Sequence, residues 1–124
     1  MLVNSEELDK LAREFETCRQ ILLALGDESR QHLILEMMQM EDCSGVRVGE
    51  ITERTHLSRP AVSHHIRILK EAGILKVRRE GTKNYYYFDV DMDALSQLTR
   101  MLDHIKAVMR SLPDRSGNEN TGGK

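Results

Sequence analysis

The segment from Ser58 to Gly73 carries the clearest helix signals in this 124-residue sequence. The Ser58 hydroxyl can cap the first turn, and Pro60 is tolerated there because first-turn amides have no acceptor within a helix. Gly73 stands where a left-handed C-cap residue is favoured. Between these bounds, the helical period places Val62 and Leu69 on an apolar side opposite polar and cationic residues. The sequence therefore predicts a helix with one buried and one solvent-facing side.

The rest of the chain predicts four more helices. The first, capped by Ser5, spans residues 5–25. The second is capped by Asp27 and runs to about residue 38, and its buried stripe consists of Leu33, Ile34, Met37 and Met38. A short helix follows over residues 49–55. The last helix begins at Asp91 and Asp93 and runs to about residue 112.

A hairpin is predicted between the last two helices. Residues 74–80 and 84–90 alternate in polarity and are rich in strand-forming side chains, with a turn at Gly81 and Thr82. The expected fold is therefore mostly α with one small β-hairpin. Residues 1–112 are expected to form one domain, and the polar, Gly-rich tail over 113–124 is expected to be disordered.

The short helix, the turn after it and the capped helix have the pattern of a helix-turn-helix. The polar side of the second helix can bond base edges and phosphates of double-stranded DNA through Ser58, Arg59, Ser63, His64, Arg67 and Lys70. His65 points about 100° away from His64, so we expect it to be a partly buried support. The following hairpin is then a wing, which should add salt-sensitive backbone contacts through Arg78, Arg79 and Lys83.

The net charge of −2 hides a basic segment. Residues 54–83 contain eight Lys and Arg against two Glu, so this stretch carries +6 and the remainder carries −8. Such a division is typical of a local footprint for nucleic acid inside an acidic chain. A solvated charged surface is the alternative, and charge alone does not separate the two.

Both terminal helices have apolar positions spaced by three and four residues, which is the seam of a helix that packs along another helix. A chain this short can hardly bury both seams alone, so we expect a homodimer. The residues expected at its interface are Leu8, Leu11, Phe15, Leu98, Leu102, Ile105 and Met109. The alternative is that the two helices pack on each other within one chain.

Four stretches, residues 24–30, 48–51, 57–66 and 69–75, resemble the ArsR/SmtB family of dimeric winged-helix repressors. The resemblance covers roughly residues 22–90. It implies that Ser58, Arg59, Ser63 and His64 contact DNA, because the matching residues do so in the family. Arg59 stands where many relatives have Gln, and since Arg favours guanine, the base preference should differ.

The sensing sites of that family are incomplete in this sequence. A cysteine pair that binds metal or metalloid in many relatives would fall at Arg47 and Gly49. A second family site, shared across the dimer, would use Asp91, Asp93 and His104, but its fourth position is Ala107, which cannot bind a metal. These three residues therefore remain weak candidate ligands, with helix capping and surface exposure as the alternative. We expect no cofactor.

The signal itself stays open between a metal, thiol chemistry, a small molecule, a protein partner or none. Cys18 lies in the seam of the first helix and is interpreted as a small hydrophobic residue. Cys43 lies in a loop near basic residues and is a candidate reactive thiol.

Other functional classes are less consistent with the sequence. No apolar run is long enough to cross a bilayer, so a cytoplasmic location is expected. An enzyme is disfavoured because Ser63 and His64 face different ways and no phosphate loop or paired carboxylates accompany them. A winged-helix adaptor that binds protein instead of DNA is the better alternative. The sequence thus predicts a DNA-binding repressor of an inverted-repeat operator, released by an unidentified signal.

Overall fold

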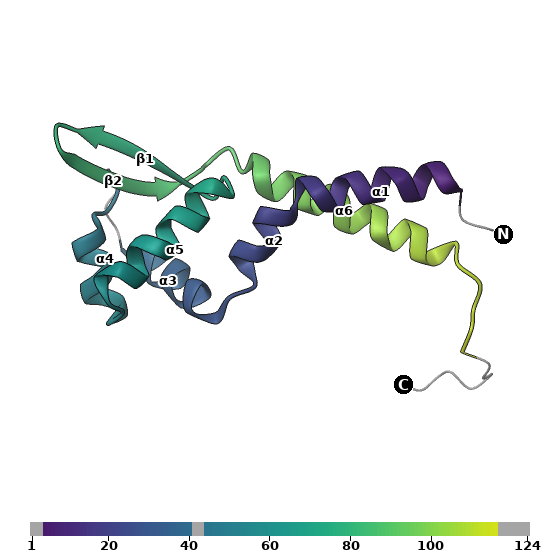
Figure 1. The fold of residues 1–124 in the computed structure, drawn as a ribbon, viewed down its shortest axis with the longest axis horizontal. Helices are drawn as coiled ribbons and strands as arrows, with labels where there is room; N and C mark the ends of the chain where they lie inside the picture. The colour runs from purple at the N-terminus through teal and green to yellow at the C-terminus, as the bar shows by residue number, and fades with distance from the viewer. Residues whose placement is uncertain (1–3, 41–43, 117–124) are drawn as a thin grey trace.

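A hairpin and three packed helices form one end of the molecule, and the first and last helices of the chain form an arm at the other (Figure 1). The computed structural model describes residues 4–40 and 44–116. In chain order the elements are α1 Ser5–Thr17, α2 Arg19–Leu25, α3 Glu28–Gln39, α4 Val48–Thr55, α5 Arg59–Glu71, β1 Leu75–Glu80, β2 Lys83–Phe88 and α6 Asp93–Arg110. This order confirms the predicted fold class, a mostly helical chain with a two-stranded wing.

The predicted continuous helix over 5–25 is wrong at its centre, where Cys18 separates α1 from α2. Cys18 has φ −91° and ψ 5°, and its carbonyl accepts a hydrogen bond from the Leu22 amide at 3.0 Å. On either side of this break, α1 packs on α6 while α2 packs on α5. The apolar spacing continues unchanged through Cys18, so periodicity could not reveal the change of direction.

The caps of the first helices are partly as predicted. The Asn4 side chain, rather than Ser5, accepts the hydrogen bond from a first-turn amide of α1. Asp27 caps α3 as predicted, accepting from the Arg30 amide at 3.0 Å. Both caps satisfy amides that have no acceptor within the helix.

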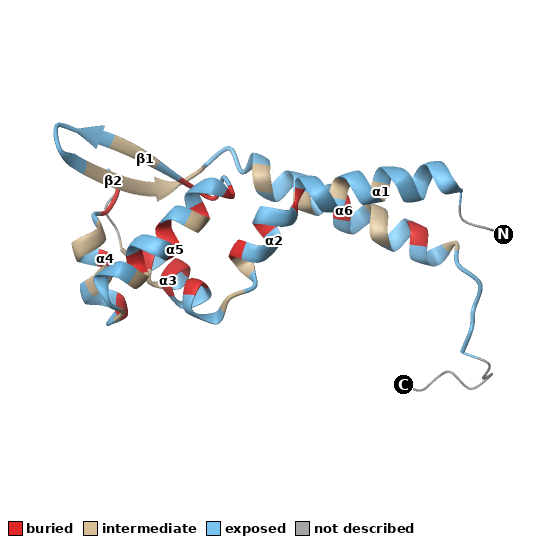
Figure 2. Ribbon diagram, in the orientation of Figure 1, coloured by how far each residue is buried: buried red, intermediate tan, exposed pale blue. Residues whose placement is uncertain are grey.

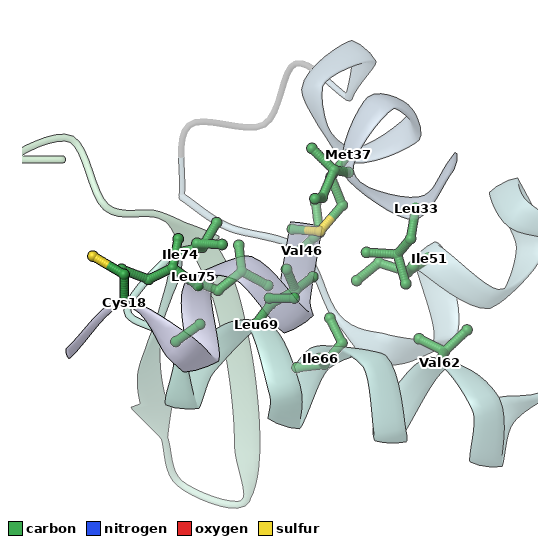
Figure 3. Close-up of a cluster of buried hydrophobic side chains, with 14 of the residues drawn as sticks. Cys18, Leu33, Met37, Val46, Ile51, Val62, Ile66, Leu69, Ile74 and Leu75 are labelled. Atoms are coloured by element: carbon green, nitrogen blue, oxygen red, sulfur yellow. The ribbon is translucent and has the colours of Figure 1, made fainter. Parts of the chain in front are cut away.

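The core lies between α2, α3, α4, α5 and the base of β1 (Figures 2 and 3). Its largest fully buried side chains include Leu33, Ile51, Val62, Leu69 and Leu75. On α3 the buried side is made by Arg30, Leu33, Ile34 and Met37, whereas Met38, predicted to be buried, is 62% exposed. Because Arg30 takes the first position of this stripe, the stripe begins one turn earlier than predicted and ends before Met38.

The helix-turn-helix consists of α4, the turn after it and α5. His56 ends α4 in the left-handed region at φ 61°, and the Ser58 hydroxyl accepts from the Ala61 amide at 3.2 Å. Pro60 lies in the first turn of α5, as predicted. The tight turn thus fixes where the second helix begins.

The wing is an antiparallel hairpin whose register runs from Leu75 opposite Phe88 to Glu80 opposite Lys83. Its second strand ends at Phe88, two residues before the predicted end. Backbone hydrogen bonds join Val46 and Tyr86 in both directions, at 2.8 and 2.9 Å, so the segment before α4 is attached to the wing.

The start of α6 differs from the prediction. Neither Asp91 nor Asp93 caps it; the residue before the helix is Met92, which is left-handed at φ 57° and makes no side-chain cap. The helix ends at Arg110. Residues 113–116 form no helix or strand, and the rest of the tail that was predicted to be disordered lies outside the described residues, as does Cys43. No helix within the described ranges is long and apolar enough to span a membrane.

Candidate nucleic-acid interface

One side of α5 is exposed to solvent (Figure 2), and its exposed residues other than Pro60 are polar or charged. Arg59, Ser63, His64, Arg67 and Lys70 are all exposed, as is Ser58 at the N-cap, and we call these six residues the reading ridge. The opposite side of α5 is buried through Val62, His65, Ile66 and Leu69. The ridge spans about 16 Å from Arg59 to Lys70, given a rise of about 1.5 Å per residue. Its dimensions and chemistry suit the major groove of a DNA duplex.

Three of the predicted cations differ in how they are placed on the wing. Arg79 and Lys83 are exposed next to the turn. Arg78 instead donates to the Glu80 carboxylate at 3.0 Å and to the Ser44 carbonyl, and its guanidinium lies 4.8 Å from the centre of the Tyr85 ring. Arg78 therefore joins the wing to the segment before α4, whereas Arg79 donates only to the Gly81 carbonyl of the turn, at 3.1 Å, and neither Arg79 nor Lys83 has an ion-pair partner in the described part of the chain.

Two more cations of the basic segment are paired with carboxylates. Arg54 on α4 contacts the Glu36 carboxylate of α3 at 3.1 Å. Lys76 lies 3.4 Å from the Asp89 carboxylate, and this hydrogen bond raises the pKa of Lys76. Within residues 4–40 and 44–116, the cations of this segment without an ion-pair partner are Arg59, Arg67, Lys70, Arg79 and Lys83. Within this segment, the positive charge without an ion-pair partner is thus confined to α5 and the wing tip.

A cleft of about 440 Å³ separates the start of α5 from the wing. Arg47 and Arg59 line it together with Thr82 and Asn84 near the wing turn. Sequence reasoning considered Arg47 only as the position of a missing metal ligand. Its exposure beside Arg59 adds it to the candidate phosphate contacts.

A buried pair holds α5 from behind. His65 is 8% exposed, as expected for a support, and its Nδ1 lies 3.3 Å from an Arg30 guanidinium nitrogen. Because a guanidinium can only donate, Nδ1 must accept, which places the proton of neutral His65 on Nε2. Burial and the neighbouring Arg30 charge both lower the pKa of His65. Arg30 also donates to the carbonyls of Leu23 and Ala24, at 2.8 and 2.9 Å.

Sequence reasoning missed Arg30. The available signal was a charged residue at the first position of an apolar helix stripe, where it must find partners to be buried.

The weak metal candidates are not gathered within one protomer. His104 Nδ1 lies 2.6 Å from the Glu14 carboxylate, and Asp91 lies 3.9 Å from the Lys76 ammonium. Asp93 stands in the first turn of α6, so about 16 Å of helix separates it from His104. No group of three or more potential ligands is arranged to hold a metal among the residues that the structure describes.

Cys18 is a free thiol with 1% exposure. Burial, followed by the nearby Glu14 carboxylate, raises the pKa of Cys18. The thiol is therefore kept protonated at neutral pH, which agrees with its interpretation as a small hydrophobic residue.

The fold and the reading ridge together define a winged helix-turn-helix protein. The profile described as bacterial regulatory protein, arsR family, matches residues 27–77. The chain is 35% identical over 92 residues to an uncharacterised HTH-type transcriptional regulator of Methanocaldococcus jannaschii, covering 74% of this chain and 98% of the relative. The chain belongs to the ArsR family of bacterial regulatory proteins, which are transcriptional regulators and not enzymes.

Two further comparisons agree. The transcriptional repressor SdpR of Bacillus subtilis is 33% identical over 66 residues, which are 53% of this chain and 69% of the repressor. A homodimeric winged helix-turn-helix DNA-binding domain of Mycobacterium bovis has the same fold, with a TM-score of 0.57, 20% identity, and coverage of 86% of this chain and 95% of that chain. The predicted family is confirmed.

The buried His65 predicts a pH dependence of stability. Its folded-state pKa lies below the ordinary value, so the unfolded chain takes up this proton first as the pH falls. The stabilisation is present above the ordinary pKa near 6.5 and is lost as the pH falls towards the folded pKa. Between pH 7 and 5, the free energy of unfolding of the natural protein should therefore fall relative to that of His65→Gln, measured by urea unfolding at fixed protein concentration.

The control is His32→Gln, the same replacement at an exposed histidine on α3. It should keep the pH slope of the natural protein. Equal pH slopes for the His65 variant and the natural protein would refute the role of His65.

Proposed function

We propose that this protein is a repressor that acts in the cytoplasm and binds an inverted-repeat operator in double-stranded DNA as a homodimer. The observation that carries the proposal is the reading ridge, whose cations lack ion-pair partners in the described ranges while the other side of α5 is anchored in the core. Every exposed residue of α5 except Pro60 is polar or charged. An adaptor that binds protein would present an apolar surface there, so the ridge favours DNA.

Within this proposal, the contacts divide by chemistry. Ser63 and His64 lie near the middle of α5 and bond base edges, and Arg59 reads a guanine through its two-pronged guanidinium. Ser58 at the helix N-terminus, together with Arg67 and Lys70 along the ridge, holds the phosphate backbone. Arg79 and Lys83 at the wing tip add backbone contacts, whereas Arg78 must first leave its present partners to do so.

The homodimer is supported by the apolar residues that the fold leaves uncovered. We call Leu8, Leu11, Phe15, Leu98, Leu102, Ile105 and Met109 the dimer seam. Within the protomer, Leu11, Leu98 and Ile105 are already half-buried against its own core, so the uncovered area comes from the other four. Helices α1 and α6 do pack on each other within the chain, but the residues of α6 that become buried are Met101 and Val108. In the seam, Leu8, Phe15 and Leu102 remain 47–48% exposed and Met109 remains 64% exposed. The homodimeric state of the Mycobacterium bovis domain agrees with a second chain covering this surface.

Footprinting on the DNA upstream of its own gene tests operator binding. Protection should cover two half-sites related by two-fold symmetry and separated by about one or two helical turns. His64→Ala should cost about 1–3 kcal/mol of binding free energy on that site and little on random DNA, because a base contact carries sequence information. His32→Ala, an exposed histidine on α3, is the control and should change neither. Equal losses on operator and random DNA would show that His64 reads no base.

A second prediction concerns Lys83. If each Lys83 neutralises one phosphate, Lys83→Ala should reduce the slope of log K against log salt by about 0.9 per site, so about twice that for a dimer. Fluorescence anisotropy over a salt series measures this slope. Lys10→Ala removes the same charge from α1, on the arm, and should leave the slope unchanged; an unchanged slope for Lys83→Ala as well would exclude the phosphate contact.

A third prediction concerns the seam. Leu102→Glu should convert the protein from a dimer into a folded monomer, because Leu102 is 47% exposed within one protomer but would bury the new charge between two. Light scattering after size exclusion should then give 14.3 kDa instead of twice that mass. Leu35→Glu, at a 59% exposed leucine outside the seam, should remain dimeric. A dimeric Leu102 variant would place the interface elsewhere.

A further inference from the structure

A pocket of about 470 Å³ lies at the elbow where the wing leads into α6 (Figure 1). Its walls include Ile34 and Met38 of α3, Phe88 and Val90 at the end of the wing, and Met92 and Leu95 at the start of α6, and Leu25 of α2 and the segment after α5 at Gly73 and Ile74 complete the lining. We call it the elbow pocket. Its lining includes no residue of the reading ridge, of the wing tip or of the dimer seam. It is therefore separate from both proposed surfaces, and it lies between them.

The walls of the elbow pocket select against charged ligands. Asp89 is the one charged residue in the lining, and its carboxylate is already paired with Lys76 at 3.4 Å. The Asp89 amide donates to the Ile74 carbonyl at 3.0 Å. In the described part of the chain, no buried side-chain nitrogen or oxygen lacks a partner. The pocket thus offers apolar contact without free polar groups, which is the environment that a neutral, apolar molecule prefers.

The same walls leave apolar area in water. Met38 is 62% exposed, Met92 54% and Val90 82%, and all three border the pocket. Covering such side chains removes apolar area from water and so favours binding. Methionine side chains are flexible and adapt to irregular ligands. The volume lies within the range of about 300–1,000 Å³ that is usual for small-molecule sites.

At the elbow, the end of α5 lies against the start of α6. A Cβ added at Gly73, just after the C-cap of α5, would lie 3.4 Å from the Ala94 side chain in the first turn of α6. The chain enters α6 through Met92, whose left-handed φ of 57° is costly for a residue with a side chain. A ligand held between α3 and the start of α6 would thus lie at the joint between the arm and α5, where a molecule that wedges the two apart would change the angle of the arm.

We propose that the elbow pocket binds a neutral, apolar small molecule and that its occupation lowers affinity for the operator. The proposal rests on the homodimeric, DNA-binding function above. DNA fixes the two reading helices of a dimer about 34–36 Å apart, or at a multiple of that spacing. A changed arm angle would move the two α5 helices of the dimer off this spacing. Ligand binding would then lower the affinity for the operator. By linkage, the operator must weaken ligand binding by the same factor.

The test uses the neutral fluorescent probe N-phenyl-1-naphthylamine and the full-length protein. Probe fluorescence should rise on binding with one site per protomer and saturate. Saturating probe should weaken operator binding about tenfold in anisotropy, and saturating operator should weaken probe binding by the same factor.

Two exposed positions on α3 provide matched variants. Met38→Glu places a charge at the pocket, whereas Leu35→Glu places the same charge one turn away, at a leucine that is 59% exposed and lines no part of it. Met38→Glu should lose probe binding by tenfold or more and keep operator affinity, and Leu35→Glu should behave like the natural protein. Val90→Glu, at a position that is 82% exposed, repeats the test without risk to the core.

The outcomes separate this proposal from the proposed function. If the unliganded protein binds no operator, the proposed function fails. If it binds the operator but the probe does not bind, binds equally to Met38→Glu, or binds without changing operator affinity, the elbow pocket is not an effector site.

Discussion

The position of α5, the second helix of the helix-turn-helix, depends on the buried guanidinium of Arg30. Arg30 is 9% exposed and donates to two carbonyls at the end of α2, those of Leu23 and Ala24, while it also contacts His65 on α5. The Leu23 carbonyl also accepts from the Gly26 amide at 3.3 Å, but carbonyls at a helix C-terminus lack the usual amide partner of the next turn, so Arg30 satisfies the Ala24 carbonyl, which would otherwise be costly to bury. A hydrogen bond to a charged group contributes about 1.5–3 kcal/mol. Helices α2, α3 and α5 therefore meet at Arg30. Its contact with His65, on the buried side of α5, fixes which side of α5 faces solvent.

With α5 fixed, the charge of the protein is divided by function. Three cations have partners within the fold. Arg54 joins α4 to α3, Lys76 pairs with Asp89 just after the wing, and Arg78 joins the wing to the segment before α4. Within residues 54–83, the cations left without ion-pair partners lie on the ridge and the wing tip. A chain with a net charge of −2 can thus present a positive surface to DNA while its acidic remainder repels it. Counting charges along the sequence located the segment, but it could not tell which cations are free.

Local rules predicted the helix-turn-helix well because each signal there is local. Ser58, Pro60 and Gly73 bound α5 by capping chemistry, and the helical period assigns its two sides correctly. The errors lie where tertiary structure decides. The break at Cys18 interrupts an unbroken apolar spacing, and Met92 begins α6 without a side-chain cap although two aspartates stand beside it. The sequence carried a signal that Arg30 is buried, but its partners could not be predicted, because they are backbone carbonyls of another helix.

The arm carries the apolar surface on which the proposed homodimer rests. Helix α6 is apolar on two sides: Met101 and Val108 are buried within the protomer, and Leu102 and Met109 face outward. Full burial of such a side chain stabilises by about 1.5–3 kcal/mol, and roughly half of that remains available where half the side chain is exposed. Two-fold symmetry counts every seam residue twice, so a few leucines suffice to hold a dimer. In the proposed dimer each α5 is joined to its own arm, so the geometry of the elbow would set how far apart the two ridges lie.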